Sequence, residues 1–299
     1  AMQSNTTASS NIGIGRLALY TNTTSVGNTA VGSLALNLST GSNNSAFGCG
    51  SLRSNTTADN NTAVGFCSLN ANTTGVSNTA VGLCSLHANT TGGENTAVGN
   101  QALDTNSTGC KNTGIGRNAL FSNTTADYNS AFGYDSLFSN TTGSNNVAVG
   151  SLALDANTTG IDNTAVGSGA LTTATTASEN TAIGRQSLLL NTTGDFNTAV
   201  GSGSLKSNTT GARNVSLGYN ALSSNTTANN SQAIGYNALV TNTTGSQNTA
   251  MGTSSMQYNT TGSNNIAIGI SSLYCNTEGD NNVSIGFGSL INNTTANNN

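Results

Sequence analysis

The asparagine of a recurring Asn-Thr-Thr segment is the most chemically suggestive side chain in this 299-residue sequence. Most copies fit Asn-x-Ser/Thr, which accepts N-linked sugar in a eukaryotic secretory pathway. The segment is also expected to form a turn, because asparagine tolerates left-handed backbone. Two interpretations stay open: a line of partial glycosylation, with O-glycans on the threonines as a variant, or a purely structural turn. The candidate acceptors are Asn5, Asn22, Asn55, Asn72, Asn89, Asn106, Asn123, Asn140, Asn157, Asn191, Asn208, Asn225, Asn242, Asn259 and Asn293.

The cysteines are the next candidates for chemistry. There are five of them, an odd number without metal-ligand spacing. Cys67 and Cys84 are 17 residues apart and occupy the same place in consecutive copies of the repeat described below. A stacked array would hold them about 5 Å apart, which is within disulfide range by Cα separation. A disulfide is one interpretation, and a stack of two small unbonded side chains is the other.

Catalytic and metal-binding residues are not predicted. His87 is the only histidine, and no nucleophile and base can be arranged around it. We expect it on the surface between Asn70 and Asp104. Acidic residues recur at one repeat position, but in separated copies, unlike the dense Gly-Asp pattern of calcium-binding β-rolls; they are Asp59, Asp127, Asp195 and Asp280. The sequence therefore predicts no enzyme, no metal site and no cofactor.

All of these residues are positioned by a 17-residue repeat, of which a clean copy runs from Asn61 to Ser77. One glycine recurs every 17 residues from Gly15 to Gly286, except that Gly32 and Gly48 are 16 apart. We number the repeat so that this glycine is position 5 and the preceding Asn is position 1. A fixed period of this kind indicates a solenoid, in which each copy buries its apolar side against its neighbours. We expect one continuous all-β solenoid of about 17 coils over residues 1–299, without a separate cap or globular domain.

The apolar positions of the repeat predict how each coil is built. Position 4 is apolar in every copy, position 9 is Leu except at Met256, and positions 3 and 8 carry small residues. Position 2 exchanges Thr for Val or Ile, which is typical of a strand. We expect positions 2 and 4 to point inward and position 3 outward, with Leu entering from the opposite wall. The glycine would allow a bend or a close backbone approach, in a coil of two short strands and two turns.

Two asparagine columns are expected to connect the coils. Position 1 is Asn except at Ser231, and position 12 is Asn except at Ala174 and in the shortened copy around Leu38–Gly41. Stacked amides about 4.8 Å apart bond to the side chains above and below. Aromatic ladders are expected where Phe121 lies over Phe138 and where Tyr219 lies over Tyr236.

The composition excludes several classes of partner. Charged residues make up 6%, and the seven basic residues form no stripe for nucleic acid. No apolar run is long enough to insert into a membrane. The strict placement of Val, Leu and Gly argues against disorder, since a disordered tract needs no register.

The segment Asn95–Leu103, which reads Asn-Thr-Ala-Val-Gly-Asn-Gln-Ala-Leu, resembles the head repeats of YadA-like trimeric autotransporter adhesins. The longer array, with its Asn-Thr-Thr-Gly turn, is similar to repeats in phage and algal-virus tail-fibre proteins. The resemblance covers essentially the whole chain and implies a left-handed β-roll and a trimer. The coil here is longer than in the adhesin heads, through the Asn-Thr-Thr turn.

These features favour a non-catalytic structural component of an extracellular fibre or filament, at a cell or virion surface. Its partners would be copies of itself, as a trimer or an end-to-end filament, together with a cell-surface receptor or glycan. Three alternatives stay open: an ice-binding solenoid with Thr and Asn ladders, a surface filament glycosylated on the Asn-Thr-Thr column, and a carbohydrate-acting enzyme. The enzyme is disfavoured because no carboxylate pair or cleft-building insertion interrupts the period.

Overall fold

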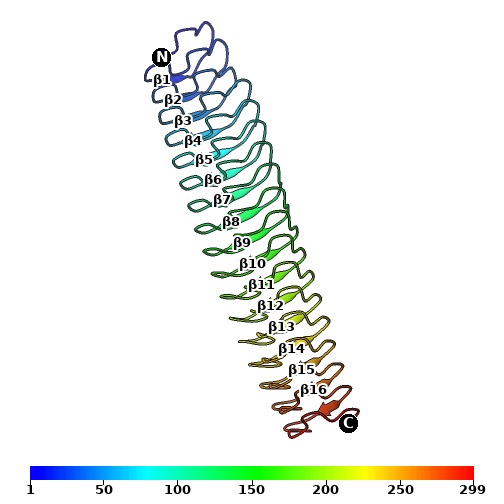
Figure 1. Ribbon diagram of the computed structural model, residues 1–299. Helices are drawn as coiled ribbons and strands as arrows, with labels where there is room; N and C mark the ends of the chain where they lie inside the picture. Colours follow the sequence, from blue (N-terminus) through cyan, green and yellow to red (C-terminus); the bar gives the residue numbers. More distant parts are fainter. The chain divides into compact units, whose positions relative to one another are not determined.

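The computed structural model describes residues 1–299, which form two compact units, Ala1–Asn146 and Val147–Asn299. Each unit is a β-solenoid that adds one three-residue strand per coil (Figure 1). The chain is all-β and contains no helix long and apolar enough to span a membrane. The all-β solenoid predicted from the repeat is confirmed.

The strands of each unit follow the 17-residue period. The first unit contains β1 (Ile12–Ile14), β2 (Thr29–Val31), β3 (Ser45–Phe47), β4 (Thr62–Val64), β5 (Thr79–Val81), β6 (Thr96–Val98), β7 (Thr113–Ile115) and β8 (Ser130–Phe132). The second contains β9 (Val147–Val149), β10 (Thr164–Val166), β11 (Thr181–Ile183), β12 (Thr198–Val200), β13 (Val215–Leu217), β14 (Gln232–Ile234), β15 (Thr249–Met251), β16 (Ile266–Ile268) and β17 (Val283–Ile285).

Within each unit, neighbouring strands are parallel and in register, so that equivalent repeat positions lie over one another. Thr62 pairs with Thr79 and Val64 with Val81, for example. The shortened copy keeps this register, because β2 still pairs with β3 from Thr29 and Ser45 onward. The missing residue is therefore absorbed by the turn, where loop length is free to vary.

The interior of the coil is filled by positions 3, 8 and 9, which corrects the predicted orientation of the strand. The position 3 alanines and the position 9 leucines are buried, whereas positions 2 and 4 lie on the outer face and are half-buried or exposed. The interior leaves little room at position 3: a Cβ on Gly114 would lie 3.1 Å from the Ala119 carbonyl oxygen and 3.4 Å from Leu103 Cγ. Only a small residue fits there, so the branched residues of the strand face outward.

Each coil has one strand rather than the two that were predicted. The segment that carries the leucine is a turn, because positions 7 and 9 both have left-handed backbone, as at Cys67 (φ 52°) and Leu69 (φ 51°). Left-handed backbone costs a residue other than glycine about 1–2 kcal/mol. Complete burial of the leucine contributes about 1.5–3 kcal/mol, which is enough to offset the cost at its own position 9.

The position 5 glycine serves both purposes expected of it. Its φ lies between 118° and 142° along the chain. A Cβ on Gly65 would also lie 2.2 Å from the carbonyl oxygen of Gly82 in the next coil. No side chain can occupy this corner without displacing the neighbouring coil.

The asparagine ladders form as predicted at position 12 and differ in detail at position 1. At position 12, Asn72 Nδ2 donates to Asn55 Oδ1 of the preceding coil (2.9 Å) and to the Gly75 carbonyl of its own turn (2.9 Å). At position 1, Asn61 Oδ1 accepts mainly from a backbone, the N–H of Asn78 (2.9 Å). Away from the two ends of the chain both columns are buried, so these amides supply the hydrogen bonds that water would otherwise make to the turns.

We expect Ala63→Val to lower the free energy of unfolding by about 1–3 kcal/mol, because the added methyl groups would overpack the coil interior. The matched change one residue later, Val64→Thr, lies on the outer face and should change it by less than about 0.5 kcal/mol. Urea unfolding of dilute protein, followed by circular dichroism, measures both. A larger loss for Val64→Thr than for Ala63→Val would contradict the orientation described here.

We expect Ala174→Asn to stabilise the second unit. Ala174 is buried at position 12, and in the next coil Asn191 Nδ2 bonds only to the Gly194 carbonyl (2.9 Å). A new amide at residue 174 would accept from Asn191 and gain about 1 kcal/mol. Thermal unfolding is the measurement, with Thr176→Asn as a control at an exposed position outside the amide ladders. An unchanged or lower unfolding temperature for Ala174→Asn would show that the amide ladder does not limit stability there.

Candidate functional site

The outer face of the strands carries an unbroken column of apolar side chains in each unit, which we call the apolar stripe. It consists of the position 4 residues, several of which are exposed by more than a third, such as Phe47 at 41% and Ile268 at 38%. The stripe comprises Ile14, Val31, Phe47, Val64, Val81, Val98, Ile115 and Phe132 in the first unit. In the second unit it comprises Val149, Val166, Ile183, Val200, Leu217, Ile234, Met251, Ile268 and Ile285.

Two further columns flank the apolar stripe. On one side lies position 2, which is mostly Thr but is Ile at residue 266 and Val at residue 283, both exposed. On the other side lies position 6, where Tyr219 and Tyr236 stack with ring centroids 5.5 Å apart. In the first unit, Arg117 lies over the Tyr134 ring at 5.6 Å in the same column. The predicted tyrosine ladder is therefore confirmed and belongs to this face of the solenoid.

The apolar stripe is suited to contact with another apolar surface. Soluble proteins rarely expose contiguous apolar patches, and those that they do expose mark interaction sites. The structure has no pocket and no group of three or more His, Cys, Asp or Glu side chains arranged to hold a metal ion. The surface chemistry is thus that of a long, shallow contact rather than of an enclosed site.

The candidate glycosylation asparagines lie inside the coil. All of them except Asn5 and Asn293 are wholly buried. The atom that would carry the sugar is hydrogen-bonded; Asn89 Nδ2, for example, donates to Asn72 Oδ1 (2.8 Å) and to the Gly92 carbonyl (2.9 Å). A glycan on these buried nitrogens would have to displace both bonds and the neighbouring coil. The structure therefore favours the turn interpretation for this column.

The second threonine of each Asn-Thr-Thr turn, at position 14, is exposed. The hydroxyls at this position make no hydrogen bond within the chain, whereas those at position 13 donate to the next coil, as Thr73 Oγ1 does to the Thr90 carbonyl (3.0 Å). The exposed column is Thr24, Thr57, Thr74, Thr91, Thr108, Thr125 and Thr142 in the first unit. In the second unit it is Thr159, Thr176, Thr193, Thr210, Thr227, Thr244 and Thr261, with Glu278 next.

The recurring aspartates have a structural role at position 16. Asp59 Oδ1 accepts from the Ser42 N–H (2.6 Å), and Asp280 Oδ1 accepts from the Ser263 N–H (2.6 Å). Asp127 and Asp195 make the equivalent bond to the coil before them. Serine and asparagine make it in other coils, as Asn229 does with the Ala212 N–H (2.7 Å). The column therefore caps backbone donors, which explains why acceptor side chains recur there.

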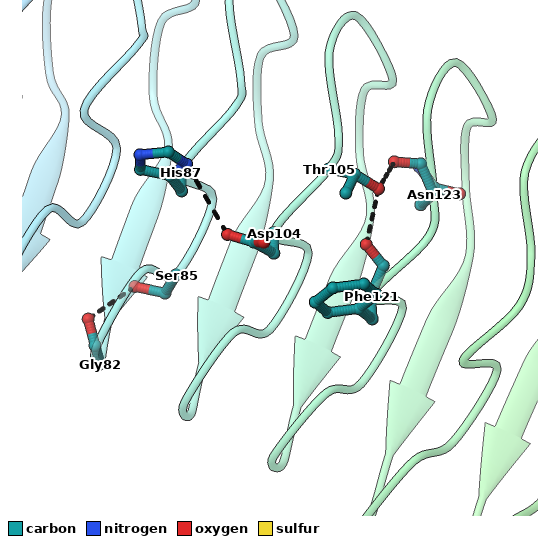
Figure 2. Close-up of polar contacts among 7 residues, drawn as sticks. All are labelled: Gly82, Ser85, His87, Asp104, Thr105, Phe121 and Asn123. Atoms are coloured by element: carbon teal, nitrogen blue, oxygen red, sulfur yellow. Dashed lines mark hydrogen bonds and ion pairs between the residues drawn. The ribbon is translucent and has the colours of Figure 1, made fainter.

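His87 and Asp104 lie over one another in neighbouring coils, as predicted (Figure 2). His87 Nδ1 is 3.9 Å from Asp104 Oδ1, and the two side chains are 44% and 17% exposed. Burial raises the pKa of Asp104, and the neighbouring His87 lowers it in part. Asp104 Oδ1 is buried without a hydrogen bond, while Thr105 beside it donates to the Phe121 carbonyl (2.7 Å). This pair lacks the third group that a proton-transfer site requires.

The remaining predicted residues are also in place. Phe121 and Phe138 stack at 5.1 Å, as expected for equivalent positions of adjacent coils. Cys67 and Cys84 are half-buried free thiols in one column. The apolar stripe is the surface feature that the sequence analysis did not predict. The sequence does contain evidence for it, because position 4 is occupied by Val, Ile, Leu, Met or Phe. A tightly packed interior does not allow such a range of side-chain sizes, so the variation indicates an outward-facing position.

Comparison with known proteins adds no family to this description. No protein-family model matches the chain, and no curated protein is similar to it.

We expect Asp104→Asn to stabilise the protein by about 1 kcal/mol at pH 7. In the equivalent position, Asn70 Nδ2 donates to the Gly50 carbonyl (2.7 Å), a bond that an ionised Asp104 cannot make. Because burial raises the pKa of Asp104, the wild type pays for the ionised carboxylate at neutral pH and is relieved of that cost as the carboxyl protonates. The advantage of the variant should therefore shrink as pH falls from 7 towards 4.

Urea unfolding at pH 7 and pH 4 measures this difference. Asn70→Asp is the matched control and should destabilise at pH 7, because it removes an existing bond and adds a buried charge. An equal effect of Asp104→Asn at both pH values would contradict the electrostatic explanation.

Proposed function

We propose that this chain is a non-catalytic structural subunit of an extracellular fibre or filament, whose copies associate side by side through the apolar stripe. The observation that carries the proposal is the stripe itself. Every strand from β1 to β17 places an apolar side chain outward at position 4. Burying such side chains contributes about 25 cal/mol per Å², so an uncovered column favours association along its length.

A second copy of the chain is the occupant that fits the stripe best. Its own stripe has the same spacing of about 4.8 Å, so side chains of one copy can lie between those of the other over many coils. The low charge supports close approach, since only 6% of residues are charged and the net charge is −4 over 299 residues. Threonine at position 2 can lie at the margin of such a contact, where a hydroxyl keeps access to water.

The extracellular setting rests on the resemblance of the repeat to adhesin heads and tail fibres. In this proposal the exposed columns at positions 6, 14 and 17 are left to bind a receptor or glycan, while the stripe joins copies. Trimer and end-to-end filament are two forms that the assembly can take.

An ice-binding solenoid is the second candidate function, and one observation favours it. The position 14 threonines form a regular exposed column with hydroxyls that make no bond within the chain. Stacked coils space these hydroxyls at about 4.8 Å. The outer strand face is less regular, because position 4 includes Phe, Leu and Met. Thermal hysteresis that is lost when Thr91 and Thr108 are both changed to Lys would establish this function and replace the fibre proposal.

We expect Val81→Lys with Val98→Lys to weaken self-association by tenfold or more, equivalent to at least about 1.4 kcal/mol, because each lysine brings a charge into an apolar contact. Sedimentation velocity over a range of protein concentrations measures the assembly. Thr91→Lys with Thr108→Lys is the matched control, since it adds the same charge to the same coils on another face.

The control should assemble as the wild type does, and circular dichroism should show both variants folded. A wild type that stays monomeric at all concentrations would contradict lateral self-association. Equal weakening in the stripe variant and its control would show that charge, and not the stripe, governs assembly.

A further inference from the structure

The geometry points to a thiol modification site in the first unit, where Cys67 and Cys84 can form a disulfide that joins two consecutive coils. The two cysteines lie at position 7, outside the apolar stripe, and the inference does not rest on lateral assembly. Both residues occupy position 7 and both are free and half-buried. The register between their coils is fixed on the strand side by the pairing of β4 with β5.

Backbone hydrogen bonds carry this register up to the two cysteines. The Cys67 N–H donates to the Cys49 carbonyl (3.0 Å), and the Cys84 N–H makes the same bond, one coil later, to the Phe66 carbonyl (3.0 Å). Equivalent residues of adjacent coils are therefore separated by one strand spacing of about 4.8 Å. That separation lies inside the Cα range of disulfides, about 4.4–6.8 Å.

The side chains must reorient for the bond to form. Gly50 is the position 7 residue of the preceding coil, and a Cβ placed on it would lie 3.3 Å from Cys67 Sγ. The sulfur of Cys67 thus leans towards the coil before it, whereas Cys84 lies in the coil after it. Bond formation therefore needs a rotation about χ1 of Cys67 and a slight approach of the two coils, because Cβ atoms about 4.8 Å apart must come within about 3.5–4.5 Å.

Burial keeps both thiols in their protonated form, and Cys67 is one of the groups that affect the pKa of Cys84. Burial is the main cause that raises the pKa of Cys84, followed by the nearby Asp104 and Cys67. Burial also raises the pKa of Cys67, with Cys49 adding to it and Arg53 opposing it. Both thiols are therefore protonated at neutral pH, and bond formation will be slow until one of them loses its proton.

The oxidant in this proposal is a low-molecular-weight disulfide such as oxidised glutathione. One cysteine thiolate attacks the glutathione disulfide, forms a mixed disulfide and releases one glutathione thiolate. The second cysteine thiolate then attacks the protein sulfur of that mixed disulfide and releases the second glutathione. The two cysteines are oxidised, one glutathione disulfide is reduced to two thiols, and two protons leave the protein for the products.

The bond would close a loop of one coil and so tie β4 to β5 covalently. Such a cross-link stabilises a protein mainly by restricting its unfolded chain. The oxidised first unit should consequently unfold at a higher temperature than the reduced one. Low-molecular-weight thiols would reverse the effect, which makes the pair responsive to the redox state of its surroundings.

The experiment is peptide mapping of the folded full chain after equilibration with oxidised glutathione and acid quenching. Cleavage after Leu69 and Leu83 separates the two cysteines unless a disulfide joins them. We expect a linked Cys67–Cys84 peptide and a fall in the thiol count from five to three. In Cys67→Ser the linked peptide should disappear, whereas Cys275→Ser should retain it.

Oxidation of the unfolded protein is the control that makes the result decisive. Wild type oxidised in denaturant should give mixed pairings among its cysteines, so a single pairing in the folded protein reflects the fold and not reactivity alone. Because the main result uses wild-type protein, it does not depend on the folding of any variant. Glutathione adducts on separate peptides, a Cys49–Cys67 bond, or a link between chains would each overturn the proposal.

Discussion

The spacing between neighbouring coils is the constraint on which the rest of the structure depends. Backbone N–H groups at positions 2, 5, 7, 9, 11, 13 and 17 donate to an adjacent coil, so the bonding runs around the whole perimeter and not only along the strand. Such bonding holds equivalent residues about 4.8 Å apart. This spacing limits side-chain size at two places. No side chain fits at the glycine corner, and only small side chains fit at position 3 inside the coil.

This narrow interior explains the distribution of apolar residues. Alanine and serine fill positions 3 and 8, and one leucine per coil supplies most of the buried apolar volume, as Leu103 and Leu120 do. Two columns of buried asparagine amides, at positions 1 and 12, donate hydrogen bonds to backbone carbonyls of the turns. Asn95 Nδ2, for example, donates to the Gly109 carbonyl (2.8 Å). The interior is thus half polar, and the branched residues of the strand remain outside. An apolar column that the coil cannot bury is the physical basis for the lateral assembly that we propose.

Most of the architecture could be predicted from the sequence, because the period alone fixes which residues stack. The register, the amide ladders, the ring pairs and the position of the shortened turn all follow from a spacing of 17 residues. The orientation of the strand could not be predicted from the period. In a three-residue strand the side chains at positions 2 and 4 point one way and that at position 3 the other, and the pattern alone does not say which side faces the interior. The side-chain sizes at Ala63 and Val64 decide the question, but only once the width of the coil is known.

The second missing feature is the left-handed backbone of the leucine turn. Sequence rules reserve that conformation for glycine and asparagine, so the sequence predicts a second strand in each coil and does not predict a left-handed turn at Leu69. In the structure, burial of the leucine side chain outweighs the cost of left-handed backbone at that residue. This burial depends on the neighbouring coils, so the sequence of one repeat does not predict it. The structure buries the asparagines of the Asn-Thr-Thr turns and exposes the position 4 side chains. The candidate site is therefore the apolar stripe and not the asparagine column.

The oxidation rate of Met251 tests the central claim most directly, because this methionine belongs to the apolar stripe and is 38% exposed in the single chain, whereas Met256 is wholly buried. Peroxide oxidation followed by mass spectrometry reports both residues in one sample. We predict that Met251 reacts much faster than Met256 in dilute protein and becomes protected as concentration and assembly increase. A Met251 rate that equals that of Met256 at every dilution would contradict the outward-facing stripe, and a fast rate that ignores concentration would contradict its burial between copies.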